Sequence, residues 1–455
     1  MVHALRKGYG AVSVERDLPN VIVGLGKTGL SCARYLAARG ETFVAVDSRE
    51  QPPGREEFRA AFPAAPVHFG GFDGELLARA RRLIVSPGVA LAEPAIAAAM
   101  ADGAEALGDV ELFARSAQAP VLAITGANGK STVTTLVGEM IRTAGYRVKV
   151  GGNLGTPALD LLSGEEPDFY VLELSSFQLE TTRSLNAAAA VVLNISADHM
   201  DRYHDLAEYA AAKRRIYRGD GMMVINDDDP LVASMGEADR ECRRFGLHDP
   251  AAADYGVRER EGQLWLACGN EDLMSTSELR IKGMHNVANA LAAVALCEAV
   301  GAPREALLEA LRHFTGLPHR TQWVARRKDV DWYDDSKGTN VGATLAALQG
   351  MPGRVVLIAG GLGKGQDFTP LRAAEAAKVR AVVLLGRDAP VIERALANAA
   401  PLVRVSTMEE AVAQAAEVAM PGDAVLLSPA CASFDMFRGY DHRGDVFAAA
   451  VRGLS

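Results

Sequence analysis

Residues 121–132 read VLAITGANGKST, and this stretch decides the class of fold. The apolar run at 121–124 has the composition of a buried strand, and the polar loop after it opens an amphipathic helix predicted over 133–142. A glycine-rich turn between a strand and a helix presents backbone N–H groups to phosphate oxygens. A lysine there neutralises the terminal phosphates, and a hydroxyl can bind Mg²⁺. The stretch therefore predicts an α/β protein with ATP as its natural ligand.

This loop departs from the general phosphate-loop pattern in one place. The full pattern begins with a glycine, where this chain has Ile124, so that only G-x-x-G-K-S remains. The spacing alone leaves a chance match open. The strand before the loop and the helix after it favour a phosphate site.

A second glycine turn lies near the N-terminus. A strand is predicted over 21–23, the turn GLGKTG over 24–29 and a helix over 30–38, and a second strand over 42–46 ends at Asp47. This order matches the dinucleotide fingerprint, in which the acidic residue binds a ribose hydroxyl. The physics is less specific, because glycines and a helix N-terminus suit any phosphate or pyrophosphate. NAD, a UDP-sugar and an ordinary tight turn all remain open on these residues alone.

Polar residues follow three other predicted strands. Ser86 comes after an apolar strand, Glu173 ends the strand predicted over 169–172, and His199 follows the strand predicted over 191–195. Because the carboxyl ends of parallel strands meet at one edge of a sheet, we expect Glu173 and His199 near the phosphate loop. A carboxylate suits Mg²⁺, whereas histidine is an unusual ligand for it. Taken singly, Ser86 is equally well explained by an ordinary turn, and Glu173 and His199 are equally well explained as solvated surface groups.

Length and composition limit the classes of protein. At about 150 residues per domain, 455 residues predict three domains. The chain has no run of the ~18 apolar residues that a membrane span needs, and residues 1–17 carry no export signal, so we expect a cytoplasmic protein. A net charge of −9 argues against a nucleic-acid surface. The five cysteines are dispersed, which predicts mostly buried free thiols rather than disulfides or a zinc site. The oligomeric state is not readable from the sequence.

The chain resembles the Mur ligase family over nearly its whole length. The motifs that carry the resemblance are GLGKTGLS at 24–31, GANGKST at 126–132, ELSSFQLE at 173–180, DHMDRY at 198–203, GMHN at 283–286, GLPHR at 316–320, DSK at 335–337 and SPACASFD at 428–435. Eight motifs in order exclude a chance similarity. The family shares the shortened phosphate loop, and the resemblance reassigns the first glycine turn from a dinucleotide to UDP.

The resemblance implies three domains and one reaction. A Rossmann-like domain over 1–108 would bind UDP, a central domain over 109–316 with a P-loop ATPase-type parallel sheet would bind ATP, and a Rossmann-like domain over 317–455 would bring the amino acid. The expected activity is that of an ATP-dependent amide-bond-forming ligase. It would add D-glutamate to UDP-N-acetylmuramoyl-L-alanine through an acyl phosphate, in peptidoglycan precursor synthesis.

The resemblance also implies the residues that bind each substrate. ATP would be bound by Gly126, Asn128, Gly129, Lys130, Ser131, Thr132, Asn286, Arg320 and Asp335. The uridine nucleotide substrate would be bound by Thr28, Asp47, Ser48, Arg49, Ser86, Asn153 and Ser175. D-glutamate would be bound by His199, Thr339, Lys364, Ser433 and Phe434.

Catalysis and metal binding would share three residues. By resemblance, the catalytic residues are Lys130, Glu173, His199 and Lys213. Ser131 and Glu173 would bind one Mg²⁺, and Glu173, His199 and Lys213 a second.

Lys213 needs a chemical change to join a metal site, because an ordinary ammonium repels Mg²⁺. The resemblance implies that CO₂ carbamylates this lysine, which gives it anionic oxygens that act as a carboxylate does. Carbamylation needs the neutral amine, which burial or the neighbouring Arg214 and Arg215 would favour. Without the resemblance, Lys213 reads as an exposed charge on an alanine-rich helix.

Three positions of the sequence depart from the family pattern. Gly338 replaces a frequent alanine, Phe434 a common leucine and Tyr440 a frequent phenylalanine.

A sister ligase for another amino acid is the first of three alternative functions, although the Asp-Asn-Pro-Arg motif of the diamino-acid-adding relatives is absent. A nicotinamide-dependent dehydrogenase would leave Lys130, Glu173 and His199 without a role. A nucleotide-binding regulator would need no amino-acid site.

Overall fold

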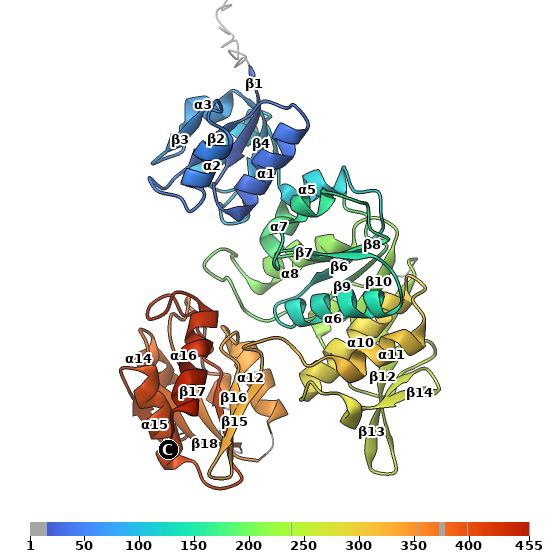
Figure 1. Ribbon diagram of the computed structural model, residues 1–455, viewed down its shortest axis with the longest axis vertical. Helices are drawn as coiled ribbons and strands as arrows, with labels where there is room; N and C mark the ends of the chain where they lie inside the picture. The colour runs from blue at the N-terminus through green and yellow to red at the C-terminus, as the bar shows by residue number, and fades with distance from the viewer. Residues whose placement is uncertain (1–15, 238, 352, 373–377, 398, 455) are drawn as a thin grey trace, which may run out of the picture. The chain divides into compact units, whose positions relative to one another are not determined.

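The structure, a computed structural model, describes residues 16–237, 239–351, 353–372, 378–397 and 399–454. The N-terminal segment without an export signal lies mostly outside the described residues. Figure 1 shows three sheets, each with its own helices, which confirms the predicted three-domain α/β architecture. By its contacts the chain forms two compact units. The first holds the N-terminal sheet together with Gly151–Glu166 and Phe177–Leu185, and the second holds most of the central part and the C-terminal sheet.

The N-terminal sheet is entirely parallel, in the order β3-β2-β1-β4-β5. Its elements are β1 (Leu18–Val23), α1 (Lys27–Ala38), β2 (Val44–Asp47), α2 (Arg55–Ala61), β3 (Val67–Phe69), α3 (Gly74–Ala78), β4 (Ala80–Val85), α4 (Pro94–Ala101), β5 (Glu105–Leu107) and α5 (Asp109–Ala114). The strand order reverses between β1 and β4, and sheets of this type bind ligands at that crevice. Helix α1 begins at Lys27 rather than at the predicted Leu30, and Gly26 is its N-cap residue.

The central sheet has nine strands in the order β14-β13-β12-β11-β10-β9-β6-β8-β7. The strands are β6 (Val121–Thr125), β7 (Val148–Gly152), β8 (Phe169–Glu173), β9 (Ala189–Val192), β10 (Met222–Asn226), β11 (Cys242–Phe245), β12 (Tyr255–Arg260), β13 (Gln263–Cys268) and β14 (Glu271–Ser275). The helices are α6 (Lys130–Thr143), α7 (Ser176–Glu180), α8 (Leu206–Arg214), α9 (Pro230–Ala233), α10 (Met284–Glu298) and α11 (Arg304–His313). The sheet is parallel from β8 to β12. The sequence did not predict that β13 and β14 extend it beyond β12 by antiparallel pairing.

One strand of this sheet is shorter than predicted. β9 ends at Val192, so the prediction of a strand through Ile195 is wrong. The main chain leaves the sheet there because it bonds to other loops: the Asn194 carbonyl accepts from Ala127 N–H (2.9 Å), and Ile195 N–H donates to Asp229 (2.6 Å). The segment after β9 therefore lies against the phosphate loop.

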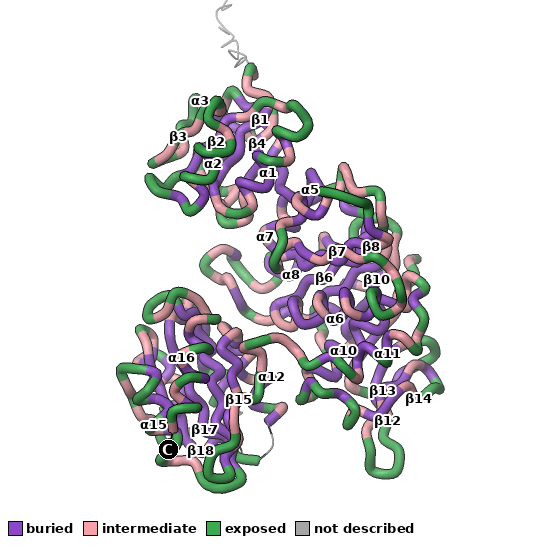
Figure 2. Tube along the Cα trace, in the orientation of Figure 1, coloured by how far each residue is buried: buried purple, intermediate pink, exposed green. Residues whose placement is uncertain are grey.

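The C-terminal sheet has the order β15-β16-β20-β17-β18-β19. Its elements are β15 (Gln322–Arg327), β16 (Val330–Asp334), α12 (Val341–Gly350), β17 (Val355–Ala359), β18 (Val379–Leu384), α14 (Ala389–Ala395), β19 (Leu402–Arg404), α15 (Met408–Val418), β20 (Ala424–Leu427) and α16 (Tyr440–Arg452). β15 pairs antiparallel and the other strands pair parallel. Figure 2 shows that the central strands of the sheets are buried and that exposed residues lie at turns and outer helix faces.

Two expectations drawn from the composition concern the cysteines and membrane-spanning helices. All five cysteines are free; Cys32, Cys297 and Cys431 are buried, and Cys242 and Cys268 are partly buried. Across the described parts of the chain, no helix combines the length and the apolar character that a bilayer crossing requires.

Candidate functional site

The first candidate site lies at the crevice of the N-terminal sheet. Gly24 follows β1 and Ser86 follows β4, and the Ser86 hydroxyl donates to the Gly24 carbonyl (3.0 Å). A side chain at Gly29 would meet that same carbonyl at 2.0 Å, so the turn needs a glycine there. The structure thus brings Ser86 to the turn that carries Thr28, and Asp47, Ser48 and Arg49 follow the adjacent strand β2.

Asp47 is already fully hydrogen-bonded inside the protein. Its carboxylate accepts from Leu25 N–H (2.7 Å), from Arg49 N–H (2.9 Å) and from two guanidinium nitrogens of Arg49 (2.9 and 2.7 Å). Burial raises the pKa of Asp47, but the bonds from Arg49 and Leu25 outweigh it and hold the pKa below its ordinary value. A carboxylate has about four acceptor positions. In this arrangement none is left for a ribose hydroxyl, whether of a dinucleotide or of a uridine nucleotide.

We expect calorimetric titration of the whole protein to detect UDP binding and not NAD binding. The turn's backbone N–H groups suit the pyrophosphate of either ligand, and the family resemblance assigns the turn to UDP. Arg49→Ala should weaken UDP binding. Tight NAD binding with no response to UDP would contradict this prediction.

The remaining two residues expected to bind the nucleotide substrate lie elsewhere. Asn153 follows β7 and belongs to the first compact unit, whereas Ser175 follows β8 and belongs to the second.

The phosphate loop lies between the ends of β6, β8 and β9. Lys130 begins α6, and its Nζ donates to the carbonyls of Gly126 and Ala127 (both 2.9 Å). Ile124 pairs in register with Glu173, which places that carboxylate beside the loop as predicted. Burial lowers the pKa of Lys130, and Glu173 counteracts this by raising it.

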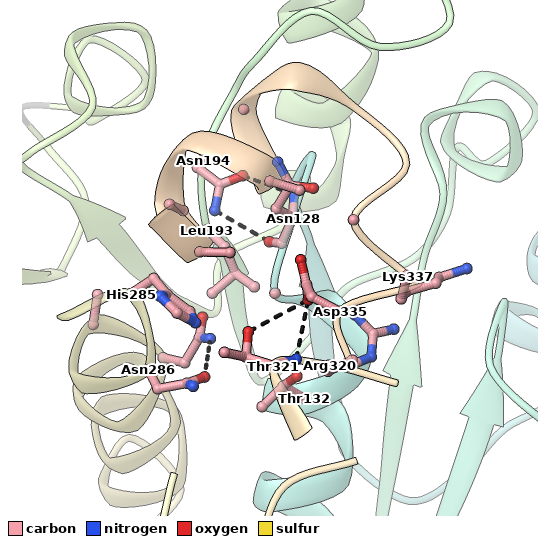
Figure 3. A pocket seen from close by; sticks show the side chains of 18 of the residues that line it. Asn128, Thr132, Leu193, Asn194, His285, Asn286, Arg320, Thr321, Asp335 and Lys337 are labelled. Carbon is pink, nitrogen blue, oxygen red and sulfur yellow. Dashed lines mark hydrogen bonds between the residues drawn. The ribbon is translucent and has the colours of Figure 1, made fainter. Parts of the chain in front are cut away.

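A cavity of about 300 Å³ opens beside this loop (Figure 3). Six of the nine residues expected to bind ATP line it: Asn128, Gly129, Thr132, Asn286, Arg320 and Asp335. Ser131 is linked to it, since Arg320 donates to the Ser131 hydroxyl (2.7 Å). Lys130 and Gly126 adjoin it along the loop. The structure therefore gathers all nine at one place.

Several residues of this cavity were not predicted from the sequence. Asn194 exchanges hydrogen bonds with the Asn128 backbone (2.8 and 3.1 Å), as Figure 3 shows. Asn289 also lines the cavity and donates to Asn286 (3.2 Å). Asn289 could have been predicted from the sequence, because it lies three residues after Asn286 and residues three apart share a helix face. Asn194 could not have been predicted, because its position depends on β9 ending earlier than the sequence suggests.

The C-terminal side of the cavity carries charges with shifted pKa values. Asp335 accepts from Thr321 N–H (3.1 Å) and from the Ser428 hydroxyl (2.7 Å), and burial raises its pKa to about 7. Burial, with Arg320 and Lys130 nearby, lowers the pKa of Lys337 to about 8. The cavity thus offers several cations to a polyphosphate.

Two of the departures from the family pattern meet here. A side chain at Gly338 would lie 2.5 Å from the Asp335 carboxylate and 2.6 Å from the Ser428 hydroxyl, so glycine leaves room for that hydrogen bond. The Tyr440 ring lies under the ammonium of Lys337, 4.0 Å from it. An aromatic ring can stabilise the lysine by a cation–π contact.

Lys213 is buried, so the interpretation as an exposed charge is wrong. Its Nζ donates to the Gly126 carbonyl (2.9 Å), the same carbonyl that Lys130 contacts. Burial first, and then Lys130, lower its pKa well below the ordinary value. Of the two alternative causes expected, burial is confirmed, whereas Arg214 points outward to Glu237 (3.2 Å).

The donor set around the phosphate loop fits Mg²⁺ bound together with nucleotide phosphates. Across the described ranges, no three or more His, Cys, Asp or Glu side chains gather as a complete metal cage. Mg²⁺ commonly uses one or two carboxylates and takes its other ligands from phosphates and water. Glu173 and the Ser131 hydroxyl, both buried at the loop, supply such donors.

His199 and Lys364 meet at Asp198. The Asp198 carboxylate lies 3.7 Å from His199 Nε2 and 3.6 Å from Lys364 Nζ. Burial alone would raise the pKa of Asp198. The nearby charges of His199 and Lys364 outweigh this effect, so the pKa lies below its ordinary value. Both His199 (φ 58°) and Lys364 (φ 52°) adopt left-handed backbone conformations, which are costly and gather at functional sites.

The other residues expected to bind D-glutamate lie on neighbouring loops. Thr339 precedes α12, and Ser433 is buried in the loop after β20. A pair of backbone bonds between Leu362 and Ala432 (both 2.9 Å) holds the Lys364 turn against that loop. Phe434 is 73% exposed, so it has no enclosed position in this arrangement.

Comparison with known proteins agrees with this geometry. The family model of the Mur ligase middle domain matches residues 124–297, that of the Mur ligase MurD-like N-terminal domain matches 19–108, and that of the Mur ligase glutamate ligase domain matches 319–431. The chain belongs to the Mur ligase family. The dehydrogenase alternative therefore loses its support.

Curated relatives match nearly the whole chain of this Mur ligase. A UDP-N-acetylmuramoylalanine–D-glutamate ligase of Nitrosococcus oceani is 58% identical over 437 residues, which is 96% of each chain. The ligase of the same name from Pseudomonas aeruginosa is 55% identical over 446 residues, covering 97% of this chain and 99% of the relative.

Solved structures share the fold at low identity. UDP-N-acetylmuramate-alanine ligase MurC of Thermotoga maritima has a TM-score of 0.59 at 19% identity and covers 96% of this chain and 99% of its own. MurF of Acinetobacter baumannii has a TM-score of 0.60 at 19% identity, covering 96% and 92%.

Proposed function

We propose that this chain is an ATP-dependent ligase that joins D-glutamate to UDP-N-acetylmuramoyl-L-alanine in peptidoglycan precursor synthesis and releases ADP and phosphate. The relatives at 58% and 55% identity carry this activity in their names. The observation that carries the proposal is the phosphate-loop cavity, where Lys130 and Arg320 lie beside the buried carboxylate of Glu173.

The chemistry follows from the low reactivity of a carboxylate toward an amine. One oxygen of the alanyl carboxylate attacks the γ-phosphorus of ATP, and ADP leaves. The amine of D-glutamate then attacks the acyl carbon of the resulting acyl phosphate, loses a proton, and phosphate leaves. Both steps gather negative charge, and cations held in advance stabilise it. Lys130 and Arg320 are the residues that we assign to this role.

The metal and the modified lysine are part of the proposal. Mg²⁺, when bound, supplies positive charge that offsets the charge on the transferring phosphate. We assign Ser131 and Glu173 to one ion, and Glu173, His199 and carbamylated Lys213 to a second. The fit of Glu173 and Ser131 and the burial of Lys213 support this assignment. We place the reaction in the cytoplasm, because ATP is supplied there.

The domain boundaries at residues 108 and 316 are likewise proposed. The family models for the N-terminal and middle domains meet between 108 and 124, and those for the middle and C-terminal domains between 297 and 319.

Mass spectrometry of the product tests the function. The whole protein, incubated with Mg²⁺, ATP, UDP-N-acetylmuramoyl-L-alanine and D-glutamate, should form a product heavier than the nucleotide substrate by one glutamyl residue, together with ADP. The product should be absent when ATP is replaced by an analogue with a non-hydrolysable γ-phosphate. ATP hydrolysis to ADP without any glutamyl product would contradict the proposal.

Lys364→Ala is expected to raise the KM for D-glutamate by about 10–100-fold and to change the KM for ATP little. A charged hydrogen bond to a substrate carboxylate is worth about 1.5–3 kcal/mol, and Lys364 lies in the predicted amino-acid site beside Asp198. Initial rates measured against each substrate test this.

A matched control for this variant is Lys328→Ala. Lys328 has a similar left-handed backbone (φ 49°) but is exposed on the turn between β15 and β16. It therefore carries the same backbone strain without a place in the site. Equal increases in both KM values for Lys364→Ala, or the same change in Lys328→Ala, would indicate a structural role only.

A further inference from the structure

A reciprocal pair of side-chain amides joins the phosphate loop to the residue before α12. Asn128 Nδ2 donates to Asn340 Oδ1 (3.2 Å), and Asn340 Nδ2 donates back to Asn128 Oδ1 (3.1 Å). Asn340 is 2% exposed, and both residues belong to the same compact unit. Removing one amide would leave buried donors and acceptors of the other unsatisfied, which is costly. The phosphate loop and the loop before α12 are thereby held in a fixed position relative to each other.

Asn340 makes two more contacts with the same side chain. Its Oδ1 accepts from Ala343 N–H (2.8 Å) and so caps the N-terminus of α12. Its Nδ2 also donates to the Asp198 carboxylate (3.3 Å), which lies 3.6 Å from Lys364. One buried amide therefore contacts the phosphate loop, a helix start and the carboxylate that faces the predicted amino-acid site.

The backbone after Asn340 continues this connection. Val341 N–H donates to Gln366 Oε1 (3.0 Å), and Gln366 Nε2 donates to the Gly363 carbonyl (2.9 Å). Gly363 directly precedes Lys364. A second route of hydrogen bonds thus runs from the start of α12 to the turn that carries Lys364.

The close approach of α12 depends on a glycine. A side chain at Gly342 would lie 2.8 Å from the Ser196 hydroxyl and 3.0 Å from its Cβ. The same hydroxyl accepts from Asn128 Nδ2 (3.2 Å). The amide pair therefore forms only while α12 packs directly against the loop after β9.

We propose that Asn340 is a positioning residue that makes the affinity for the amino-acid substrate depend on occupation of the phosphate loop. This inference rests on the proposed function. A bound nucleotide fixes the loop that carries Asn128, and the amide pair carries this order to Asn340. Asp198 and Gln366 then hold the Lys364 turn in its binding position. Such a coupling between two sites is reciprocal and commonly amounts to about 5–150-fold in affinity.

Asn340→Ser tests the inference, because serine keeps an oxygen that can cap α12 but removes the amide N–H groups. D-glutamate affinity is measured by calorimetry on the full chain, with UDP-N-acetylmuramoyl-L-alanine present and with or without a non-hydrolysable ATP analogue. In the wild-type protein the analogue should tighten D-glutamate binding by about 10-fold or more. In Asn340→Ser this factor should fall below about 3-fold, while affinity for the analogue itself changes by less than about 3-fold.

Two further variants separate coupling from loss of stability. Thr407→Ala removes the cap of α15, where Thr407 accepts from Glu410 N–H (3.1 Å), and should keep the wild-type coupling. Gly342→Val blocks the approach of α12 at Ser196 and also crowds the Asn128 amide, whose Nδ2 would lie 3.5 Å from the added Cβ, and it should lose the coupling as Asn340→Ser does. It also provides a second test if Asn340→Ser folds poorly.

The outcomes are distinct. Wild-type coupling retained in Asn340→Ser and Gly342→Val would overturn the inference and leave the proposed function intact. Coupling lost equally in Thr407→Ala would also overturn it, because any lost cap would then suffice. A wild-type protein that binds no D-glutamate under either condition would overturn the proposed function as well.

Discussion

Lys130→Met is expected to lower kcat by about 10³-fold while leaving the affinity for UDP-N-acetylmuramoyl-L-alanine within a small factor of wild type. Removing one fixed group that stabilises transition-state charge commonly costs about 10²–10³-fold, and Lys130 is a partly buried cation of the phosphate loop. Its charge is needed where phosphate is transferred. The UDP moiety is assigned to the turn after β1, in the other compact unit.

The measurement pairs steady-state rates with calorimetry of the nucleotide substrate. Lys378→Met is the matched control, because the Lys378 ammonium also donates to a carbonyl, that of Gln349, at 2.9 Å but lies near the surface. It should retain wild-type kcat. A loss of nucleotide-substrate affinity equal to the loss of rate in Lys130→Met would refute the separation of the two roles.

Lys213→Ala is expected to lose most activity, by about 10²-fold or more, and to recover part of it when formate or acetate is added. The side chain is buried, and burial lowers the pKa of Lys213 well below its ordinary value, which increases the share of the neutral amine that reacts with CO₂. A small carboxylate can take the place of the carbamate in the space that alanine leaves. Lys213→Arg keeps the positive charge and should stay inactive, because a guanidinium cannot provide an anionic ligand.

The modification itself can be measured separately from activity. Labelled bicarbonate should give a carbamate signal in the wild-type protein by NMR, and Lys213→Ala should lack it. Arg214→Ala, one residue away on the exposed side of α8, should keep both signal and activity. Full activity of Lys213→Arg in CO₂-depleted buffer would rule out the carbamate.

The sequence predicted the parts of the site that depend on local pattern. Glu173 ends an apolar run, and the helix after the phosphate loop follows a glycine turn, so both could be placed without tertiary contacts. Contacts between distant segments could not be placed by pattern. Arg320 bonds Ser131 across 189 positions, and Asn340 bonds Asn128 across 212. No periodicity in either segment specifies the partner.

Burial explains the other differences from the sequence-based expectations. Lys213 reads as surface by its neighbours in the sequence, and its low pKa comes from the fold, which encloses it beside Lys130. The antiparallel strands β13 and β14 show no alternation of buried and exposed positions, because the two buried positions of each strand are adjacent. The end of β9 was misplaced because Leu193 and Ile195 are apolar and continue the run, although Ile195 N–H donates to Asp229 outside the sheet.

The most direct test of the central claim is phosphate release from ATP, measured for each candidate amino acid with UDP-N-acetylmuramoyl-L-alanine present or omitted. We predict rapid release only when D-glutamate and the nucleotide substrate are both present. L-alanine, lysine, a diamino acid and a dipeptide should give background rates. Release that is faster with one of these than with D-glutamate, or that does not depend on the nucleotide substrate, would contradict the account.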